Sequence, residues 1–179
     1  MEAAKILHAE KGVLATSWEE IAERAQVAPA TVYRHFPSLA ELIPACARSV
    51  FDVIKPPTLE EASVKFAHLD TASARLEYLT RESFHCYERG AGWLHAARRE
   101  GHLIPALADA LQVQDQSLVV LLRAALGGVR PSEPTMVLLK TFSDFPFWES
   151  LIQMGMRPKA AADVAVRLAR DQLAKEGFK

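Results

Sequence analysis

The stretch between residues 16 and 36 constrains the fold more than any other part of the chain, because its spacing predicts two short helices joined by a tight turn. In the first half, Ile21, Ala22 and Ala25 share one helical face, and charged side chains lie off that face. Residues 26–28 break this pattern. Pro29 then suits the first position of a second helix, where a missing N–H costs little. The stretch therefore predicts a helix-turn-helix.

The first helix of the pair has a start signal in the sequence. Ser17 with Glu20, or Thr16 with Glu19, matches a capping box, in which a hydroxyl accepts a backbone N–H three residues on and the carboxylate reaches back to the capping residue. Both alternatives place the start of the helix within one residue of the same point. The first turn of the motif is therefore expected at residues 17 to 20.

The second helix is expected to have an inner and an outer side. Val32 and Phe36 are four residues apart and can both face inward, which leaves small and polar side chains on the other faces. The second helix of such a motif can enter the major groove of DNA, where Arg34 can reach a phosphate or a guanine edge. Hydroxyl, phenol and imidazole groups suit phosphate oxygens. The residues expected to contact DNA are Thr16, Ser17, Pro29, Ala30, Thr31, Tyr33, Arg34 and His35.

The motif resembles the TetR family of bacterial one-component repressors. The resemblance implies an all-α homodimer that binds a near-palindromic, double-stranded DNA operator and is released by a small organic effector. Two positions depart from the family pattern: Gln26 stands where members usually have Gly in the turn, and Leu39 where many have a phosphate-binding Lys. The matching residues are Thr16-Ser17, Ile21-Ala22, Ala25, Val27, Thr31 through Phe36, Ser38 and Glu41-Leu42.

Charge and motif content bear on the alternatives. Residues 1–55 hold six Lys or Arg and seven Asp or Glu, so DNA binding must rest on local geometry rather than on bulk charge. The sequence leaves open a second interpretation, an interaction dimer that has lost DNA binding. Residues 1–55, called the head below, have a net acidic charge, Leu39 replaces the usual Lys, and the basic arm before the first helix is missing. An enzyme on a helical bundle is a weaker alternative, because the sequence shows no nucleophile–base pair and no Gly-rich phosphate loop. We therefore expect a transcriptional regulator that is not an enzyme and that has no metal site and no cofactor.

Composition places the protein among globular, intracellular chains. Its 179 residues are half hydrophobic and can bury a substantial core. No apolar run approaches the roughly 18 residues of a membrane span. Cys46 and Cys86 are two lone cysteines, which fit a reducing compartment better than a disulfide scaffold. We expect a cytoplasmic protein.

The remainder of the chain predicts further helices and no strand, so the expected class is all-α with about nine or ten helices. Ser38 with Glu41 is expected to cap a helix that contains Pro44, carries Val53 and Ile54 on its apolar stripe and ends at Pro56-Pro57. The two prolines mark the expected boundary between a helix-turn-helix DNA-binding domain (1–55) and a ligand-binding and dimerisation domain (56–179). Gly90 and Gly92 are expected to end a helix that starts near residue 71.

The C-terminal segments 135–154 and 158–176 are expected to form two long helices and the homodimer interface. Two heads about 34 Å apart are needed to read an operator, and the alanines of the last apolar stripe favour close packing against a partner. The body is expected to enclose a largely apolar pocket between the helices of residues 71–126, for an uncharged or weakly polar organic molecule. The candidate lining residues are Tyr78, Phe84, Tyr87, Trp93, Phe142 and Phe145.

Overall fold

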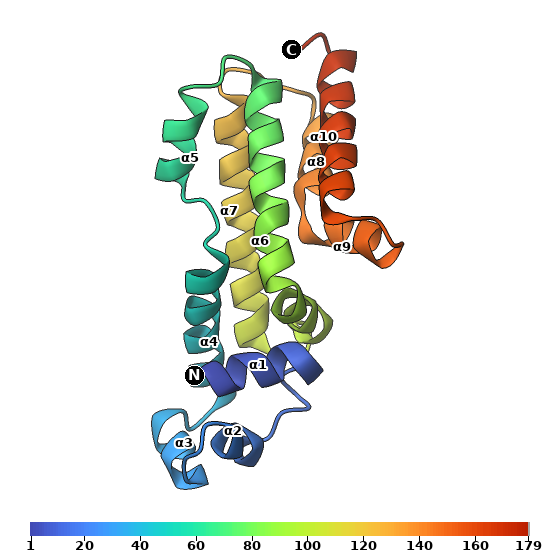
Figure 1. Ribbon diagram of the computed structural model, residues 1–179. Helices are drawn as coiled ribbons and strands as arrows, with labels where there is room; N and C mark the ends of the chain where they lie inside the picture. Colours follow the sequence, from blue (N-terminus) through green and yellow to red (C-terminus); the bar gives the residue numbers. More distant parts are fainter. Residues whose placement is uncertain (179) are drawn as a thin grey trace. The chain divides into compact units, whose positions relative to one another are not determined.

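The computed structural model describes residues 1–178, apart from the side chains of Val53 and Ile54. The expected place of these two side chains on the apolar stripe of the fourth helix therefore lies outside the described residues. Over the described range the chain forms ten helices and no strand, which confirms the all-α class (Figure 1). The helices are α1 (Glu2–Lys11), α2 (Trp18–Arg24), α3 (Pro29–His35), α4 (Leu39–Ile54), α5 (Leu59–Phe66), α6 (Ala72–Glu100), α7 (Pro105–Leu126), α8 (Glu133–Ser143), α9 (Phe145–Gln153) and α10 (Pro158–Lys175).

The chain divides into two compact units. Unit 1 comprises residues 1–55 and 89–114, and unit 2 comprises residues 56–88 and 115–179. The division after residue 55 falls where the sequence places its domain boundary, but residues 89–114 group with the N-terminal helices. Helices α6 and α7 are therefore each shared, because one part of each belongs to unit 1 and the other part to unit 2.

In unit 1, the first four helices meet in one small apolar core. Val32 is buried on the inner side of α3, as its spacing predicts, so that the opposite side of this short helix faces solvent. Half-buried Trp18, Phe36 and Leu39 pack around the same core. The buried members of the core are Ala3, Ala4, Leu7, Ile21, Ala22, Val32, Leu42 and Cys46.

The helix starts in the head follow the sequence signals in part. Of the two capping boxes possible at α2, the one that forms is Ser17 with Glu20. The expected box of Ser38 with Glu41 is wrong: Ser38 is the N-cap of α4, but its hydroxyl makes no capping bond. The Ser38 carbonyl instead accepts the N–H groups of Glu41 and Leu42, so backbone bonds alone close that turn. Helix α4 runs on through Pro44.

In unit 2, the core is built from residues of α5, α6, α7, α8 and α10. Leu79, Leu122, Leu139 and Leu173 are fully buried in it. Arg81 joins α6 to α10 through Asp163, with 2.8 Å between guanidinium and carboxylate. None of the described helices is long and apolar enough to span a membrane.

Helix α6 corrects the prediction that Gly90 and Gly92 end a helix. It continues over 29 residues, from Ala72 to Glu100. A glycine inside a helix costs only about 1 kcal/mol relative to alanine, which is too little to stop a helix that packs well on either side of it. Gly92 also serves packing, since a Cβ there would lie 3.2 Å from the Ala9 Cβ and 3.3 Å from the Ala9 carbonyl oxygen. The missing side chain allows α1 to approach α6.

The segment 135–154 corrects a second prediction, because it forms two helices and not one. Asp144 ends α8 and caps α9, with its Oδ1 accepting the Phe145 N–H at 2.7 Å. Pro146 stands in the first turn of α9, where its lack of an N–H is harmless, whereas in a continuous helix it would remove a hydrogen bond and crowd the preceding turn. The helix is therefore interrupted at residue 144.

Candidate functional site

The polar side of α3 is the candidate site of unit 1. Tyr33, Arg34 and His35 are exposed, and the N-terminal residues Pro29 and Ala30 are exposed as well. Thr31 is half-buried at the edge of the same surface. Because Val32 fixes the inner side of the helix, these side chains share the solvent side or its borders. The structure therefore brings together the six candidate residues that the sequence places on this helix.

The turn before α3 depends on an unusual backbone conformation at Gln26. Its φ is 56°, in the left-handed region that residues other than Gly, Asn and Asp seldom adopt. The turn is closed by the Val27 N–H, which donates to the Ala22 carbonyl at 3.0 Å. The two helices are thus joined by a left-handed residue at the position where the sequence lacks the usual glycine.

Trp18 positions Tyr33, a role that the sequence analysis misses. Trp18 is the first residue of α2, and its ring lies 5.3 Å from the Tyr33 ring, centroid to centroid, with 39° between the planes. Tyr33 is still 42% exposed, so its hydroxyl end can reach a ligand while its ring is held. The contact fixes one side chain of α3 against α2.

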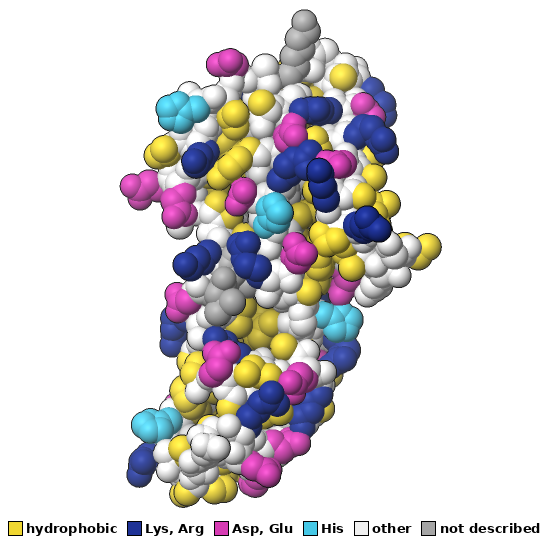
Figure 2. Space-filling view, in the orientation of Figure 1, with side chains coloured by type: hydrophobic (Ala, Val, Ile, Leu, Met, Phe, Trp, Pro, Cys, Tyr) yellow, Lys and Arg dark blue, Asp and Glu magenta, His cyan; other side chains and the backbone are white. Residues whose placement is uncertain are grey.

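Basic side chains of the head divide into paired and unpaired ones. Arg24 is held by a two-pronged bond to Glu10, at 2.9 and 3.1 Å, and Lys11 is paired with Glu20. Arg34, in contrast, makes no hydrogen bond or ion pair with any residue that the structure describes. Figure 2 shows a basic side chain beside a histidine over α3, while basic and acidic side chains are interspersed over the rest of the visible face. Arg34 is therefore available to an external anion.

Thr16 and Ser17 lie just before α2 and are already engaged internally. The Thr16 hydroxyl donates to the Gly12 carbonyl at 2.7 Å, and the Ser17 hydroxyl accepts the Glu20 N–H at 3.1 Å. Each hydroxyl keeps hydrogen-bonding capacity beyond that bond. Their predicted contact with DNA stays a prediction.

The loop between α1 and α2 is held by Glu100, the last residue of α6, which the sequence analysis also misses. One carboxylate oxygen of Glu100 accepts the N–H groups of Val13 and Leu14 at 2.7 and 2.9 Å. The other accepts from Arg99 at 2.9 Å. Burial alone would raise the pKa of Glu100, but the Leu14 N–H, Arg99 and the Val13 N–H together hold it below its ordinary value. A charged carboxylate from α6 thus anchors the entrance to α2.

Comparison with known proteins relates the N-terminal helices to a known family. Residues 1–46, from α1 into α4, match the sequence model of "Bacterial regulatory proteins, tetR family". This N-terminal part of the chain is therefore similar to the tetR family. In the matched region, α3 stands in the place of the recognition helix of a helix-turn-helix.

Solved structures show a similar fold over nearly the whole chain. One is a Clostridium perfringens protein whose name assigns it to the regulation of fatty acid metabolism; its TM-score is 0.68 at 15% identity, over 94% of this chain and 95% of that chain. Another is a TetR transcriptional regulator from Rhodococcus sp. RHA1, with a TM-score of 0.57 at 22% identity, over 96% of this chain and 92% of that chain. At these identities the likeness concerns the fold. No curated protein matches the sequence.

The aromatic residues expected to line a ligand pocket lie in several places. Phe84, Tyr87 and Phe145 pack together: the Tyr87 ring is 6.0 Å from Phe84 and 5.5 Å from Phe145, and its hydroxyl donates to the Ser143 carbonyl at 3.0 Å. All three are buried. Tyr78 packs edge-on against Phe66, and Phe142 packs against Phe147. Trp93 belongs to unit 1, where it lines a pocket of about 180 Å³ with residues of α1.

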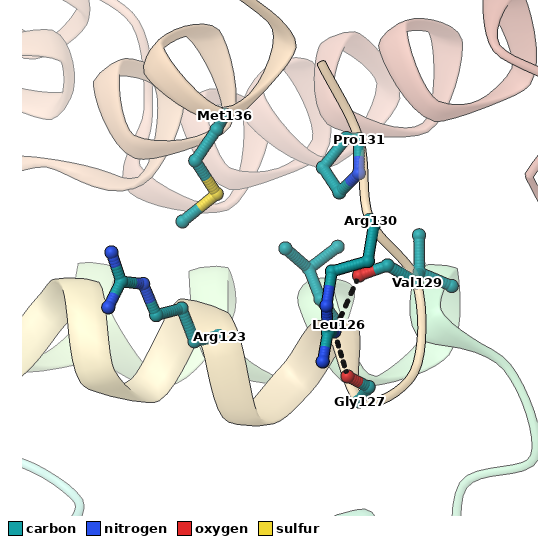
Figure 3. Close-up of a pocket in the computed structure, with 7 residues that line it drawn as sticks. All are labelled: Arg123, Leu126, Gly127, Val129, Arg130, Pro131 and Met136. Atoms are coloured by element: carbon teal, nitrogen blue, oxygen red, sulfur yellow. Dashed lines mark hydrogen bonds between the residues drawn. The ribbon is translucent and has the colours of Figure 1, made fainter. Parts of the chain in front are cut away.

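Two larger pockets, both among the described residues of unit 2, have basic linings. Figure 3 shows the first, of about 420 Å³, where Arg123 and Arg130 flank Leu126 and Met136 at the junction of α7 and α8. Arg130 is partly engaged, because its guanidinium donates to the Gly127 and Val129 carbonyls at 2.7 and 3.1 Å. The second pocket, of about 490 Å³, lies between α6 and the start of α10. These linings differ from the sequence expectation of an uncharged ligand.

Proposed function

We propose that this chain is a cytoplasmic, ligand-responsive repressor that binds a near-palindromic operator as a homodimer and releases it when a small organic effector binds. In this proposal residues 1–55 form the DNA-binding domain, and residues 56–179 provide ligand binding and dimerisation. The chain has no catalytic role in this scheme. The eight DNA-contacting residues predicted from the sequence are retained, with the exposed side of α3 at their centre.

The observation that carries the proposal is the state of Arg34. It stands exposed on α3 without an internal partner, whereas Arg24 and Lys11 are neutralised within the head. An arginine can form a bidentate bond to a guanine edge or bind a phosphate. With a head that is acidic overall, a free cation on the recognition helix is the feature that most favours DNA over a protein partner.

The test begins with selection of bound sequences from random double-stranded DNA, followed by fluorescence anisotropy on the selected sequence. Arg34→Ala is expected to weaken binding about 5- to 150-fold if Arg34 reads a base, which corresponds to about 1–3 kcal/mol. Tyr33→Ala is expected to weaken it as well, because Tyr33 stands beside Arg34 on the same surface. Near-palindromic selected sites are expected if the protein binds as a dimer.

Arg48→Ala is the matched control, because Arg48 is an exposed arginine of unit 1 that lies on α4, outside the motif. Its affinity for DNA is expected to stay at the parent value. Unchanged affinity in both Tyr33→Ala and Arg34→Ala would remove α3 from the interface. If selection enriches no sequence at all, the second interpretation, an interaction dimer that has lost DNA binding, replaces the first.

A further inference from the structure

We infer that the pocket between α6 and α10 is the effector site and that it takes a carboxylate on an apolar body; this rests on the ligand-responsive function proposed above. The pocket lies wholly in unit 2, and its volume of about 490 Å³ is within the range of roughly 300–1,000 Å³ that small-molecule sites occupy. One wall comes from residues 81–88 of α6. The other comes from residues 157–162, where α10 begins.

The floor of the pocket is apolar and firmly supported. Phe84 and Ala162 line it and are only 3% and 6% exposed. Behind Phe84 stands Tyr87, whose ring in turn packs against Trp148 at 6.2 Å. Because this aromatic cluster is close-packed, the floor offers a preformed surface for a hydrocarbon chain or ring, and contact with it releases water from apolar surface.

The rim of the pocket carries cations that the protein itself does not neutralise. Arg157 and Lys159 are exposed, and neither has an ion-pair or hydrogen-bond partner among residues 1–178. Arg81, on the opposite wall, is held by Asp163 and Glu77 at 2.8 and 3.0 Å. Glu88 is the one acid among the described lining residues, and it lies 4.0 Å from His85 Nδ1.

These charges select the chemical class of the ligand. A neutral molecule would leave Arg157 and Lys159 without a partner, and a cation would be repelled by both. A carboxylate placed between them gains charge-assisted hydrogen bonds, and its apolar part can then lie on Phe84. The positive end of the α10 dipole adds to the same preference. The Figure 3 pocket fits less well, since Arg130 is already bound to two carbonyls.

The position of the pocket connects it to the DNA-binding head through one helix. Its α6 wall is continuous with the end of the same helix, where Glu100 holds the loop that leads into α2. A ligand that displaces α6 at residues 81–88 therefore acts on a helix whose last residue holds the loop before α2. A coupling of 5- to 150-fold in DNA affinity is typical of such linked sites.

The proposal is tested by calorimetric titration of the full chain with decanoate, with 1-decanol and decyltrimethylammonium as neutral and cationic probes of the same chain length. Decanoate is expected to bind at least tenfold more tightly than either. Arg157→Ala combined with Lys159→Ala is expected to weaken decanoate binding at least tenfold. Arg167→Ala, an exposed arginine on the same helix outside the pocket lining, is the matched control and is expected to bind like the parent.

Three results would overturn the site: equal binding of decanoate and 1-decanol, unchanged binding in the double variant, or loss of binding in Arg123→Ala, which would move the ligand to the Figure 3 pocket. A second copy of the chain would be the occupant of this surface if two results came together. The parent would sediment as a dimer without binding decanoate, and the double variant would sediment as a monomer. DNA affinity is measured separately. If decanoate binds as expected but leaves DNA affinity unchanged, the site stands and the proposed ligand response fails.

Discussion

Gln26 forms the turn between α2 and α3 in a left-handed backbone conformation. Its φ of 56° places a side chain in the left-handed region, and the side chain itself is exposed. Glycine is usual at this position in the family pattern, so the sequence marks residue 26 as unusual. The backbone shows in addition that the chain keeps the turn without glycine. The residue therefore carries conformational strain that its own side chain does not offset with a described contact.

Gln26→Gly is expected to stabilise the protein by about 0.5–1 kcal/mol. Glycine removes the energetic penalty of the left-handed conformation, but part of this stabilisation is lost because glycine also raises the conformational entropy of the unfolded chain. Gln26→Ala is the control: it removes the same side chain but keeps Cβ, so it should leave stability near the parent value or lower it. The measurement is the free energy of unfolding in urea. Equal stability of the glycine and alanine variants would show that the backbone at residue 26 is not strained.

His8 is a second residue whose chemistry follows from its surroundings. It is 1% exposed, and neither ring nitrogen has a hydrogen-bond partner. Burial lowers the pKa of His8 from 6.5 to about 4, although Glu100 acts in the opposite direction. Helical spacing could place His8 on either face of α1, so its burial was not predictable from the sequence.

The lowered pKa of His8 predicts a loss of stability in acid. Above pH 6.5 the imidazole is neutral in both the folded and the unfolded chain, so its contribution is fully present. As the pH falls from 6.5 to about 4, the unfolded chain binds a proton that the folded chain resists, and stability falls by about 2 kcal/mol. Urea unfolding at pH 7 and pH 4.5 should show a smaller loss for His8→Leu than for the parent.

His102→Leu serves as the comparison for this pH dependence, because His102 is an exposed histidine of the same unit. Its loss of stability between the two pH values should equal that of the parent, since His102 is not buried. A parent and a His8→Leu variant that lose the same free energy on acidification would show that His8 is not the source.

At the scale of elements, the sequence predicts what depends on local chemistry. The capping box at Ser17 and the first-position Pro29 both form as expected. Each depends on residues within a few positions of one another. Periodicity likewise predicts the inner side of α3 through Val32, and with it the outer side that carries Arg34.

What the sequence does not predict depends on contacts between distant residues. Gly92 stays inside a helix because α1 packs against it, and Glu100 bonds to Val13, 87 positions away. No spacing rule connects such residues. The pocket between α6 and α10 is missed for the same reason, since Arg81 and Arg157 lie on helices that only the fold brings together. Of the six aromatic residues predicted to line a pocket, Phe84 lines this one, and most of the six pack against other rings.

At the scale of the whole molecule, the proposed dimer must use what the single chain leaves uncovered. The alanines of the last helix were expected to face a partner, but Ala161, Ala165 and Ala169 are buried within the chain itself. Helices α8 and α10 pack against each other in unit 2. On their other sides Val137 is 58% exposed, and Leu168 is half-buried. The apolar side chains available to a partner are therefore fewer than the stripe suggests.

Leu168→Glu is expected to dissociate the proposed dimer, because a carboxylate buried without a partner at an interface costs about 3–5 kcal/mol, or more than a hundredfold in dimer affinity. Sedimentation velocity at several concentrations measures the effect. Val64→Glu is the matched control, since Val64 is a 59% exposed apolar residue on α5 of the same unit, and this variant should sediment like the parent. Far-ultraviolet circular dichroism must show that Leu168→Glu keeps its helices. A folded Leu168→Glu protein that remains a dimer at the parent's concentrations would place the interface elsewhere than on this side of α10.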